Sequence, residues 1–158
     1  MEILDELTEL SPLGFTVGLH IRFATPLLYH STFPPAWVRH YNDNSYYLRD
    51  PLVFWGIGTT GVTRWSEIGL PDPFDVIKQA AQFGMKYGAS ASCGPISSRS
   101  IVGIGRGDRE FTNEELVKLE EIALRLHEEN TPPTELTQAQ IEADRKSTRL
   151  NSSHGKLY

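Results

Sequence analysis

The chain has 158 residues, of which 39% are hydrophobic and 22% charged, and its formal net charge is −5. This length is typical of one domain that can build a core of its own. The single cysteine, Cys93, excludes an internal disulfide and fits a reducing compartment. No apolar run approaches the roughly 18 residues that span a bilayer, and the acidic N-terminus is unlike a signal peptide. We therefore expect a cytoplasmic protein without membrane association.

The negative charge is concentrated in one part of the chain. Residues 1–107 carry a net charge of −1, residues 108–138 carry −6, and residues 139–158 carry +2. The excess of acid therefore belongs to one predicted helix, whose glutamates face water. A tail with a charge of +2 is too weak to bind DNA by neutralising phosphates.

The first predicted elements are a short amphipathic helix over residues 2–10 and a strand over residues 16–23. The strand alternates, so that Val17, Leu19, Ile21 and Phe23 share an apolar face. His20 lies on the opposite face and is expected to be exposed. Residues 24–33 predict a second strand after the break at Pro26.

Proline pairs and aspartate caps predict the next three helices. Pro34 and Pro35 suit the first turn of a helix that runs past Tyr41. Asp50-Pro51 and Asp72-Pro73 each place a capping aspartate before a proline at the first helical position. Glycines at 56, 58 and 61 end the second of these helices, and Gly88 is expected to end the third.

Strands are predicted at residues 62–65, 89–96 and 100–106, before a long acidic helix. Thr112 and Glu115 form a capping box at the start of that helix, and its apolar stripe includes Leu119 and Ile122. Because the strands cluster in pairs along the chain, the order of elements favours an α+β fold with helices packed on an antiparallel sheet.

Evidence for catalysis or for a bound metal or cofactor is weak. The segment from Gly56 to Gly61 matches the GxGxxG dinucleotide fingerprint by letter, but a short β-branched segment follows it where the motif needs a helix. The histidines show no paired metal spacing, Cys93 has no CxxC partner, and no serine lies in a GxSxG frame. A small dinucleotide-binding enzyme is therefore only a minor alternative, and we expect no metal and no cofactor.

Aromatic and acidic residues between positions 33 and 65 are the most informative feature. Phe33, Trp37 and Tyr41 are spaced by four along one helical flank, and Asp50 and Trp65 follow. Aromatic side chains with a polar tip and a buried carboxylate are the groups expected in a pocket for a small amphiphilic ligand. The same spacing also suits an ordinary core helix, and Asp50 suits a simple helix cap.

These residues resemble the autoinducer-binding domain of LuxR-type quorum-sensing regulators. The resemblance rests on Phe33-Pro34-Pro35-Ala36-Trp37, Tyr41, Asp50-Pro51, Trp65 and Tyr87-Gly88 at matching spacings, and it spans roughly residues 1–130. It implies an α-β-α sandwich, with helices on both faces of a central five-stranded antiparallel sheet. It also implies that an acyl-homoserine lactone binds between sheet and helices, and that the liganded protein is a homodimer.

The resemblance assigns roles to individual residues. Trp37 matches the donor to the lactone carbonyl, and Asp50 matches the acceptor for the ligand amide. Tyr41 and Trp65 match the aromatic walls, and Gly88 matches a site of close backbone approach. The helix before Gly88 would face the acyl chain through Val76, Ala80 and Met85.

Two positions depart from the family pattern. Phe33 stands where the family often has a tyrosine, and Gly105 where a serine can donate to the acyl carbonyl. A missing buried hydrogen bond costs about 1–3 kcal/mol. The sequence therefore predicts either an altered lactone pose or another small amphiphile.

The C-terminal part is interpreted as the beginning of a second domain. Residues 131–135, with Pro132-Pro133, are read as a linker, and residues 136–145 resemble the opening of the family's helix-turn-helix domain. Residues 146–158 abandon that pattern and are read as a non-native tail. DNA binding is expected only through a complete C-terminal domain; the alternative is a stand-alone module that binds ligand or forms heterodimers without DNA-binding output.

Overall fold

The computed structural model describes residues 2–23 and 25–131, so the predicted linker beyond Thr131, the helix-turn-helix segment and the tail lie outside the described residues. Three short 3-10 turns cover Tyr46–Leu48, Trp65–Glu67 and Ile96–Ser98. The helices within the described residues are α1 (Ile3–Leu10), α2 (Pro35–Asp43), α3 (Pro51–Gly58), α4 (Val76–Gln82) and α5 (Asn113–Glu129). The strands are β1 (Phe15–Ile21), β2 (Leu28–Ser31), β3 (Gly61–Arg64), β4 (Tyr87–Cys93) and β5 (Arg99–Arg106).

The strands form one five-stranded sheet in the order β2-β1-β5-β4-β3. Each neighbouring pair is antiparallel. The central strand, β5, pairs with the whole of β4, from Tyr87 opposite Arg106 to Cys93 opposite Ser100. The predicted antiparallel sheet is confirmed.

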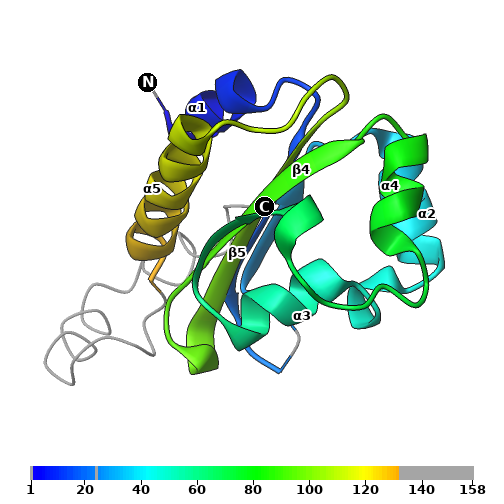
Figure 1. Cartoon of the computed structure of the whole chain (residues 1–158). Coiled ribbons are helices and arrows are strands. Elements are labelled where there is room, and N and C mark those ends of the chain that lie inside the picture. The colour runs from blue at the N-terminus through cyan, green and yellow to red at the C-terminus, as the bar shows by residue number, and fades with distance from the viewer. Residues whose placement is uncertain (1, 24, 132–158) are drawn as a thin grey trace, which may run out of the picture.

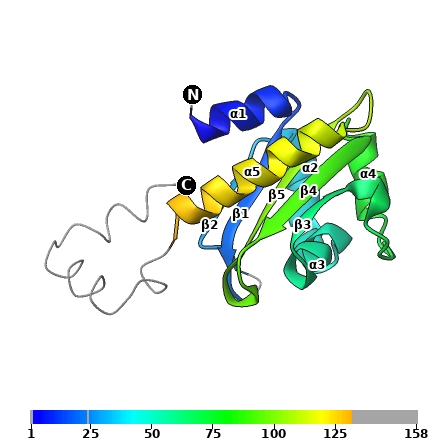
Figure 2. The ribbon, with the colours of Figure 1, turned by 60° about the vertical axis from the view of Figure 1, so that its left-hand side comes forward.

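Helices cover both faces of the sheet, as the resemblance implies (Figures 1 and 2). Helices α1 and α5 lie side by side on one face, where they bury a large apolar core that includes Leu7, Leu119 and Ile122. Helices α2, α3 and α4 lie on the other face, where a second and smaller cluster surrounds Trp37 and Trp65. The domain is therefore an α-β-α sandwich with two separate cores.

The two faces of the central strands carry different kinds of side chain. Toward α1 and α5, the directly paired residues Val17, Val102 and Ala91 are buried and apolar. One position along, the paired residues are Thr16, Gly103 and Ser90, which alternate onto the opposite face. These side chains are too small to fill the space under α2, α3 and α4, and a pocket lies there.

Strand β1 departs from simple alternation near its end. The register of its pairing with β5 shifts between Gly18 and Ile21, and His20 has φ of +52°. This irregularity turns His20 inward, so that it is 1% exposed and stacks on His127 with ring centroids 4.1 Å apart. The prediction of an exposed His20 is wrong for this reason. Ile21 is turned to the pocket side, and Phe23, beyond the strand with φ of +51°, is fully exposed.

Helix α4 begins later than predicted. The first helical residue is Val76, four positions after Asp72. The Asp72 carboxylate nevertheless caps the helix, because it accepts hydrogen bonds from the backbone N–H groups of Val76 and Ile77, both at 2.9 Å. The aspartate therefore has the predicted role, but it acts from outside the helix.

The same helix also ends earlier than predicted. It stops at Gln82, and Gly84, with φ of +97°, supplies the left-handed residue that often follows a helix. Met85 therefore lies after α4, and Gly88 lies within β4. The predictions that Gly88 terminates the helix and that Met85 belongs to it are wrong.

Helix α5 begins with the predicted capping box. The Thr112 hydroxyl accepts from the Glu115 N–H at 3.2 Å, and the Glu115 carboxylate accepts from the Thr112 N–H at 2.7 Å. Phe111 and Leu116, on either side of the cap, are both buried. None of the helices among residues 2–23 and 25–131 combines the length and the apolar character needed to cross a membrane.

Candidate ligand-binding site

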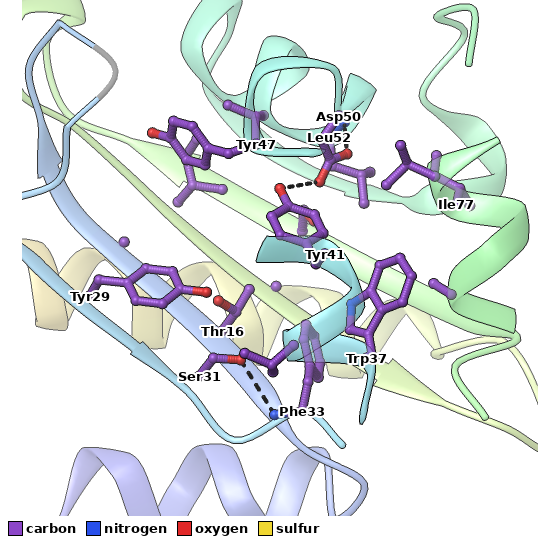
Figure 3. A pocket seen from close by; sticks show the side chains of 18 of the residues that line it. Thr16, Tyr29, Ser31, Phe33, Trp37, Tyr41, Tyr47, Asp50, Leu52 and Ile77 are labelled. Atoms are coloured by element: carbon purple, nitrogen blue, oxygen red, sulfur yellow. Dashed lines mark hydrogen bonds between the residues drawn. The ribbon is translucent and has the colours of Figure 1, made fainter. Parts of the chain in front are cut away.

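The pocket lies between the sheet and the helices α2, α3 and α4, and most of its lining is apolar. Its floor is the small-residue face of β1, β4 and β5, and its walls are aromatic side chains (Figure 3). Because small residues on the floor face large rings on the walls, the space between them is open to a flat or extended molecule. An apolar pocket with a few fixed polar groups is typical of a site for a small organic ligand.

Helix α2 and the segment before it place three aromatic rings in the wall. Trp37 and Tyr41 are one turn apart on the buried flank, with ring centroids 5.7 Å apart and an edge-to-face arrangement. Phe33, just before the helix, packs edge-to-face on Trp65 at 6.5 Å. Each ring is thus held by another ring, which fixes the shape of the wall.

Asp50 is the buried acid of the pocket. It is the N-cap of α3, where one carboxylate oxygen accepts from the Leu52 N–H at 2.8 Å. The other oxygen accepts from the Tyr41 hydroxyl, also at 2.8 Å (Figure 3). Burial raises the pKa of Asp50 to about 6, against the opposing effect of these two hydrogen bonds. The cap predicted from sequence is confirmed, and the same carboxylate also lines the pocket.

Tyr41 remains a hydrogen-bond donor at neutral pH. Burial, and next the negative charge of Asp50, raise the pKa of its hydroxyl far above the ordinary value of 10.0. The hydroxyl therefore keeps its proton and holds the carboxylate in place. A carboxylate oxygen can accept more than one hydrogen bond, so Asp50 retains acceptor capacity for a ligand.

The two tryptophans of the pocket differ in their hydrogen bonding. The Trp65 indole N–H donates to the Ser90 hydroxyl at 3.0 Å, which fixes the ring against the sheet. The Trp37 indole, 5% exposed, finds no acceptor among residues 2–23 and 25–131, and its nitrogen lies on the ring edge turned toward Tyr41 (Figure 3). Trp37 can therefore offer a donor to a ligand.

Most of the residues predicted for the site line one pocket, although they come from four different segments of the chain. Gly88, Met85 and Gly105 do not line it. The seven that do are Phe33, Trp37, Tyr41, Asp50, Trp65, Val76 and Ala80.

Packing explains why the other three predicted residues lie elsewhere. A Cβ atom added at Gly88 would overlap the Trp65 indole. The Trp65 ring therefore packs against the backbone at Gly88, at the position where the resemblance implies a close approach of the backbone to the ligand. A Cβ at Gly105 would meet Met85 at 3.2 Å, because the fully buried Met85 side chain covers that part of β5. Gly103, two residues earlier on the same strand, lines the pocket in its place.

Several polar lining residues were not predicted. Thr16 and Ser31 are partners across β1 and β2, and Tyr29 lies on the same face of β2. The only sequence signal for Thr16 was its position opposite the apolar face of its strand. Tyr47, in the turn after α2, carried no signal that separates it from a surface residue.

The glycine-rich segment is not a dinucleotide site. Its first glycines belong to the end of α3, and Gly61 begins β3. The motif therefore connects a helix to a strand, whereas the pyrophosphate-binding loop connects a strand to the N-terminus of a helix. Among the residues that the structure describes, no group of three or more histidine, cysteine or acidic side chains could hold a metal ion.

An apolar pocket of this kind, between a sheet and the helices on one of its faces, defines the class of the protein as a small-molecule-binding domain. The sequence model of the autoinducer binding domain family matches residues 14–129, which is most of the chain. The chain therefore belongs to the autoinducer-binding domains of LuxR-family quorum-sensing transcription regulators, a family that is regulatory and not enzymatic.

Solved structures with the same fold include CepR2, which is described as a LuxR-family transcription factor, and SdiA. The N-acylhomoserine lactone dependent factor CepR2 from Burkholderia cenocepacia is 19% identical, with a TM-score of 0.60 over 78% of this chain and 76% of that chain. Escherichia coli SdiA is 17% identical, with a TM-score of 0.65 over 94% of this chain and 73% of that chain. SdiA in complex with octanoyl-rac-glycerol matches at 16% identity and a TM-score of 0.62, over 94% and 71%. No curated protein matches the chain.

Proposed function

We propose that the domain binds an acyl-homoserine lactone, or a small amphiphile with a similar polar head, in the pocket under α2, α3 and α4. The observation that carries this proposal is the pairing of an acceptor and a donor in one wall. Asp50 is a buried carboxylate with unused acceptor capacity, and Trp37 is a buried indole with an unused N–H. An amide-linked lactone needs this combination, since its amide N–H donates and its ring carbonyl accepts.

The rest of the pocket suits the remainder of such a ligand. Tyr41 and Trp65 would enclose the head group, while Val76 and Ala80 of α4 would contact the acyl chain. Aromatic walls supply a large apolar contact area for the head, and aliphatic side chains do the same for the chain. CepR2, which shares the fold, is described as N-acylhomoserine lactone dependent, which supports the same ligand class here.

The acyl carbonyl is the one ligand group without an obvious partner. Phe33 has no hydroxyl, and Gly105 is covered by Met85. The Ser90 hydroxyl accepts from Trp65 and still has its own proton to donate, and it lies on the pocket floor. We propose that Ser90 supplies the donor that the two departures from the family pattern remove.

A glycerol ester is the alternative ligand that this site would accept. SdiA shares the fold and has been solved in complex with octanoyl-rac-glycerol. Such a molecule would present hydroxyl donors to Asp50 where a lactone presents an amide N–H. The proposed site residues would be the same for both ligands.

We further propose that ligand binding controls DNA binding through a complete C-terminal domain in a homodimer. Ligand burial between sheet and helices would stabilise the folded domain and favour dimers that place two recognition helices on DNA. This regulatory output depends on the ligand-binding step, which is therefore the step to test first.

A thermal-shift titration tests the proposed ligand class. N-acyl-homoserine lactones of increasing chain length, 1-octanoyl-glycerol and NAD would each be added to the chain. A ligand at one hundred times its dissociation constant stabilises the fold by about 2.7 kcal/mol, which raises Tm by several degrees. We expect at least one lactone to do so and NAD to have no effect. If no lactone and no acylglycerol raises Tm, the proposed ligand class is wrong.

A further inference from the structure

Two histidines hold the C-terminal end of α5 against the sheet, on the face opposite the pocket. The buried His20 ring of β1 stacks on the ring of His127, which lies in the last turn of α5 (Figure 2). The His20 Nε2–H donates to the His127 carbonyl oxygen at 2.9 Å, because a carbonyl oxygen can only accept. The last four carbonyls of a helix have no partner within it, so a strand residue supplies a bond that α5 itself cannot make.

Two buried serines fix both rings. The Ser100 hydroxyl accepts from the His20 backbone N–H at 3.0 Å, and its own proton can therefore be donated to the His127 Nδ1 atom at 2.6 Å. Because the neutral His20 ring carries its proton on Nε2, its Nδ1 atom accepts from the Ser98 hydroxyl at 2.7 Å. We call the four residues His20, Ser98, Ser100 and His127 the histidine clasp.

The residues next to the clasp on two strands line the pocket. Ile21 of β1 and Ile101 of β5 lie in the pocket lining, and their neighbours His20 and Ser100 belong to the clasp on the other face of the sheet. Successive residues of a strand point to opposite faces. A ligand that packs on the two isoleucines therefore contacts the same two strands that hold the end of α5.

The clasp depends on the irregularity in β1. Along a regular strand, His20 would follow Gly18 to the pocket face, and Ile21 would follow Leu19 to the face of α5. The register shift between Gly18 and Ile21 exchanges the two side chains, and it leaves His20 in the left-handed region, which is unfavourable without supporting contacts. The regular and the shifted arrangement thus differ in whether an imidazole or an isoleucine faces the apolar pocket.

We propose, on the basis of the proposed function, that an apolar ligand favours the shifted arrangement and thereby closes the histidine clasp. The ligand packs better on Ile21 than on an imidazole, which would need hydrogen-bond partners inside the pocket. A ligand shifts such an equilibrium by the difference in its affinity for the two arrangements. Binding in the pocket therefore fixes the last turn of α5, from which the chain continues toward its C-terminal residues.

Hydrogen–deuterium exchange of the whole chain, with and without ligand, tests this coupling. The ligands are N-octanoyl-homoserine lactone and 1-octanoyl-glycerol, each added at a concentration that calorimetry shows to be saturating. The clasp adds about one hydrogen bond to the last turn, so we expect bound ligand to slow exchange at residues 127–131 by about fivefold or more. Residues 113–116, at the other end of α5, exchange by local fraying and should show no such slowing.

His20→Asn breaks the clasp and keeps the backbone conformation. Asparagine adopts the left-handed region readily, but its side chain is too short to reach the His127 carbonyl. We expect the variant to bind ligand, while the effect of ligand on residues 127–131 falls below about twofold. Because coupling is reciprocal, ligand affinity should fall by a similar factor to that by which protection is lost. His30→Ala, which changes an exposed histidine on β2, is the matched control and should behave as wild type.

Ser98→Ala is a milder second variant. It removes one hydrogen bond of the clasp and leaves both rings in place, so it tests the same coupling if His20→Asn does not fold. We expect it to reduce the effect of ligand on residues 127–131 to about twofold.

The outcomes separate the two proposals. If a ligand binds the wild type without slowing exchange at residues 127–131, the coupling is overturned and the proposed function stands. The coupling is also overturned if His20→Asn, or Ser98→Ala in its place, keeps the full wild-type effect. If calorimetry shows that neither ligand binds, the coupling and the proposed ligand class fail together.

Discussion

Asp50 combines a structural role with a place in the pocket wall. It caps α3 and accepts from Tyr41, and burial keeps its pKa near 6. The folded state therefore binds this proton more tightly than the unfolded chain does, since the ordinary pKa is 3.8. Ligand binding uses the ionised form, because a charged acceptor makes the stronger hydrogen bond.

These properties predict opposite pH dependences for stability and for ligand binding. Because the pKa of Asp50 is raised on folding, its contribution to the free energy of unfolding is full below about pH 4 and falls as pH rises through 6, by about 3 kcal/mol. Lactone affinity should instead increase as pH rises through 6. Urea denaturation and calorimetry from pH 4.5 to 7.5 measure the two trends.

Asp50→Asn should separate the two effects. The variant has no charge to bury, so the fall in stability between about pH 4 and 6 should largely disappear, while lactone affinity at neutral pH should drop about tenfold or more. Asp43→Asn, an exposed change at the end of α2, is the matched control. A variant that keeps wild-type lactone affinity would remove Asp50 from the proposed site.

Gly88 tests whether the position of Trp65 shapes the pocket. An alanine Cβ would overlap the Trp65 indole and displace it from Ser90, so Gly88→Ala should destabilise the fold by about 1–3 kcal/mol and weaken ligand binding. Gly58→Ala is the control, because a Cβ there has no neighbour within 4 Å. Chemical denaturation and lactone titration of both variants check this, and equal behaviour of the two would contradict it.

At the scale of single residues, sequence reasoning located the wall of the pocket better than its floor. Trp37, Tyr41 and Asp50 lie close in sequence on helices with clear start signals, so their meeting was predictable. Thr16 meets Ser90 only through the pairing of β1 with β5 and of β5 with β4, which a single sequence does not specify. Met85 was misplaced because Gly88 was taken as the glycine that ends α4, whereas Gly84, four residues earlier, ends it.

Among the elements, α5 follows most directly from local sequence. Its capping box, its buried stripe and its acidic outer face were all visible in the sequence, and they agree with one another. The end of β1 was not predictable, because the irregularity at His20 depends on contacts with distant segments. Local sequence signals are therefore enough to predict α5, whereas the conformation at the end of β1 depends on contacts between distant segments.

The cap of α5 gives a prediction that concerns stability alone. Thr112→Ala removes the side-chain acceptor for the Glu115 N–H and should cost about 1 kcal/mol. Thr8→Ala, where the exposed hydroxyl donates only to a carbonyl of its own helix, should cost much less. Urea unfolding curves measure both. Because α5 lies on the face opposite the pocket, a large loss of lactone affinity in Thr112→Ala would contradict the proposed separation of the two cores.

At the scale of the whole molecule, the two faces of the sheet differ in their packing. The α1/α5 face holds the larger apolar core, whereas the face under α2, α3 and α4 carries small residues, aromatic walls and the buried carboxylate. The order of elements predicted the sheet and the covering helices, and the family resemblance predicted a ligand site between the sheet and its helices, where a pocket lies. The large core stabilises the fold, so the other face can keep an open pocket.

A crystal structure of the chain with a bound acyl-homoserine lactone is the most direct test of this account. We predict that the ligand lies between the sheet and α2, α3 and α4. Its amide nitrogen should be within hydrogen-bond distance of an Asp50 carboxylate oxygen, and its lactone carbonyl within reach of the Trp37 indole nitrogen. A ligand bound on the α1/α5 face, or bound in the pocket with its head group away from Asp50 and Trp37, would contradict the account.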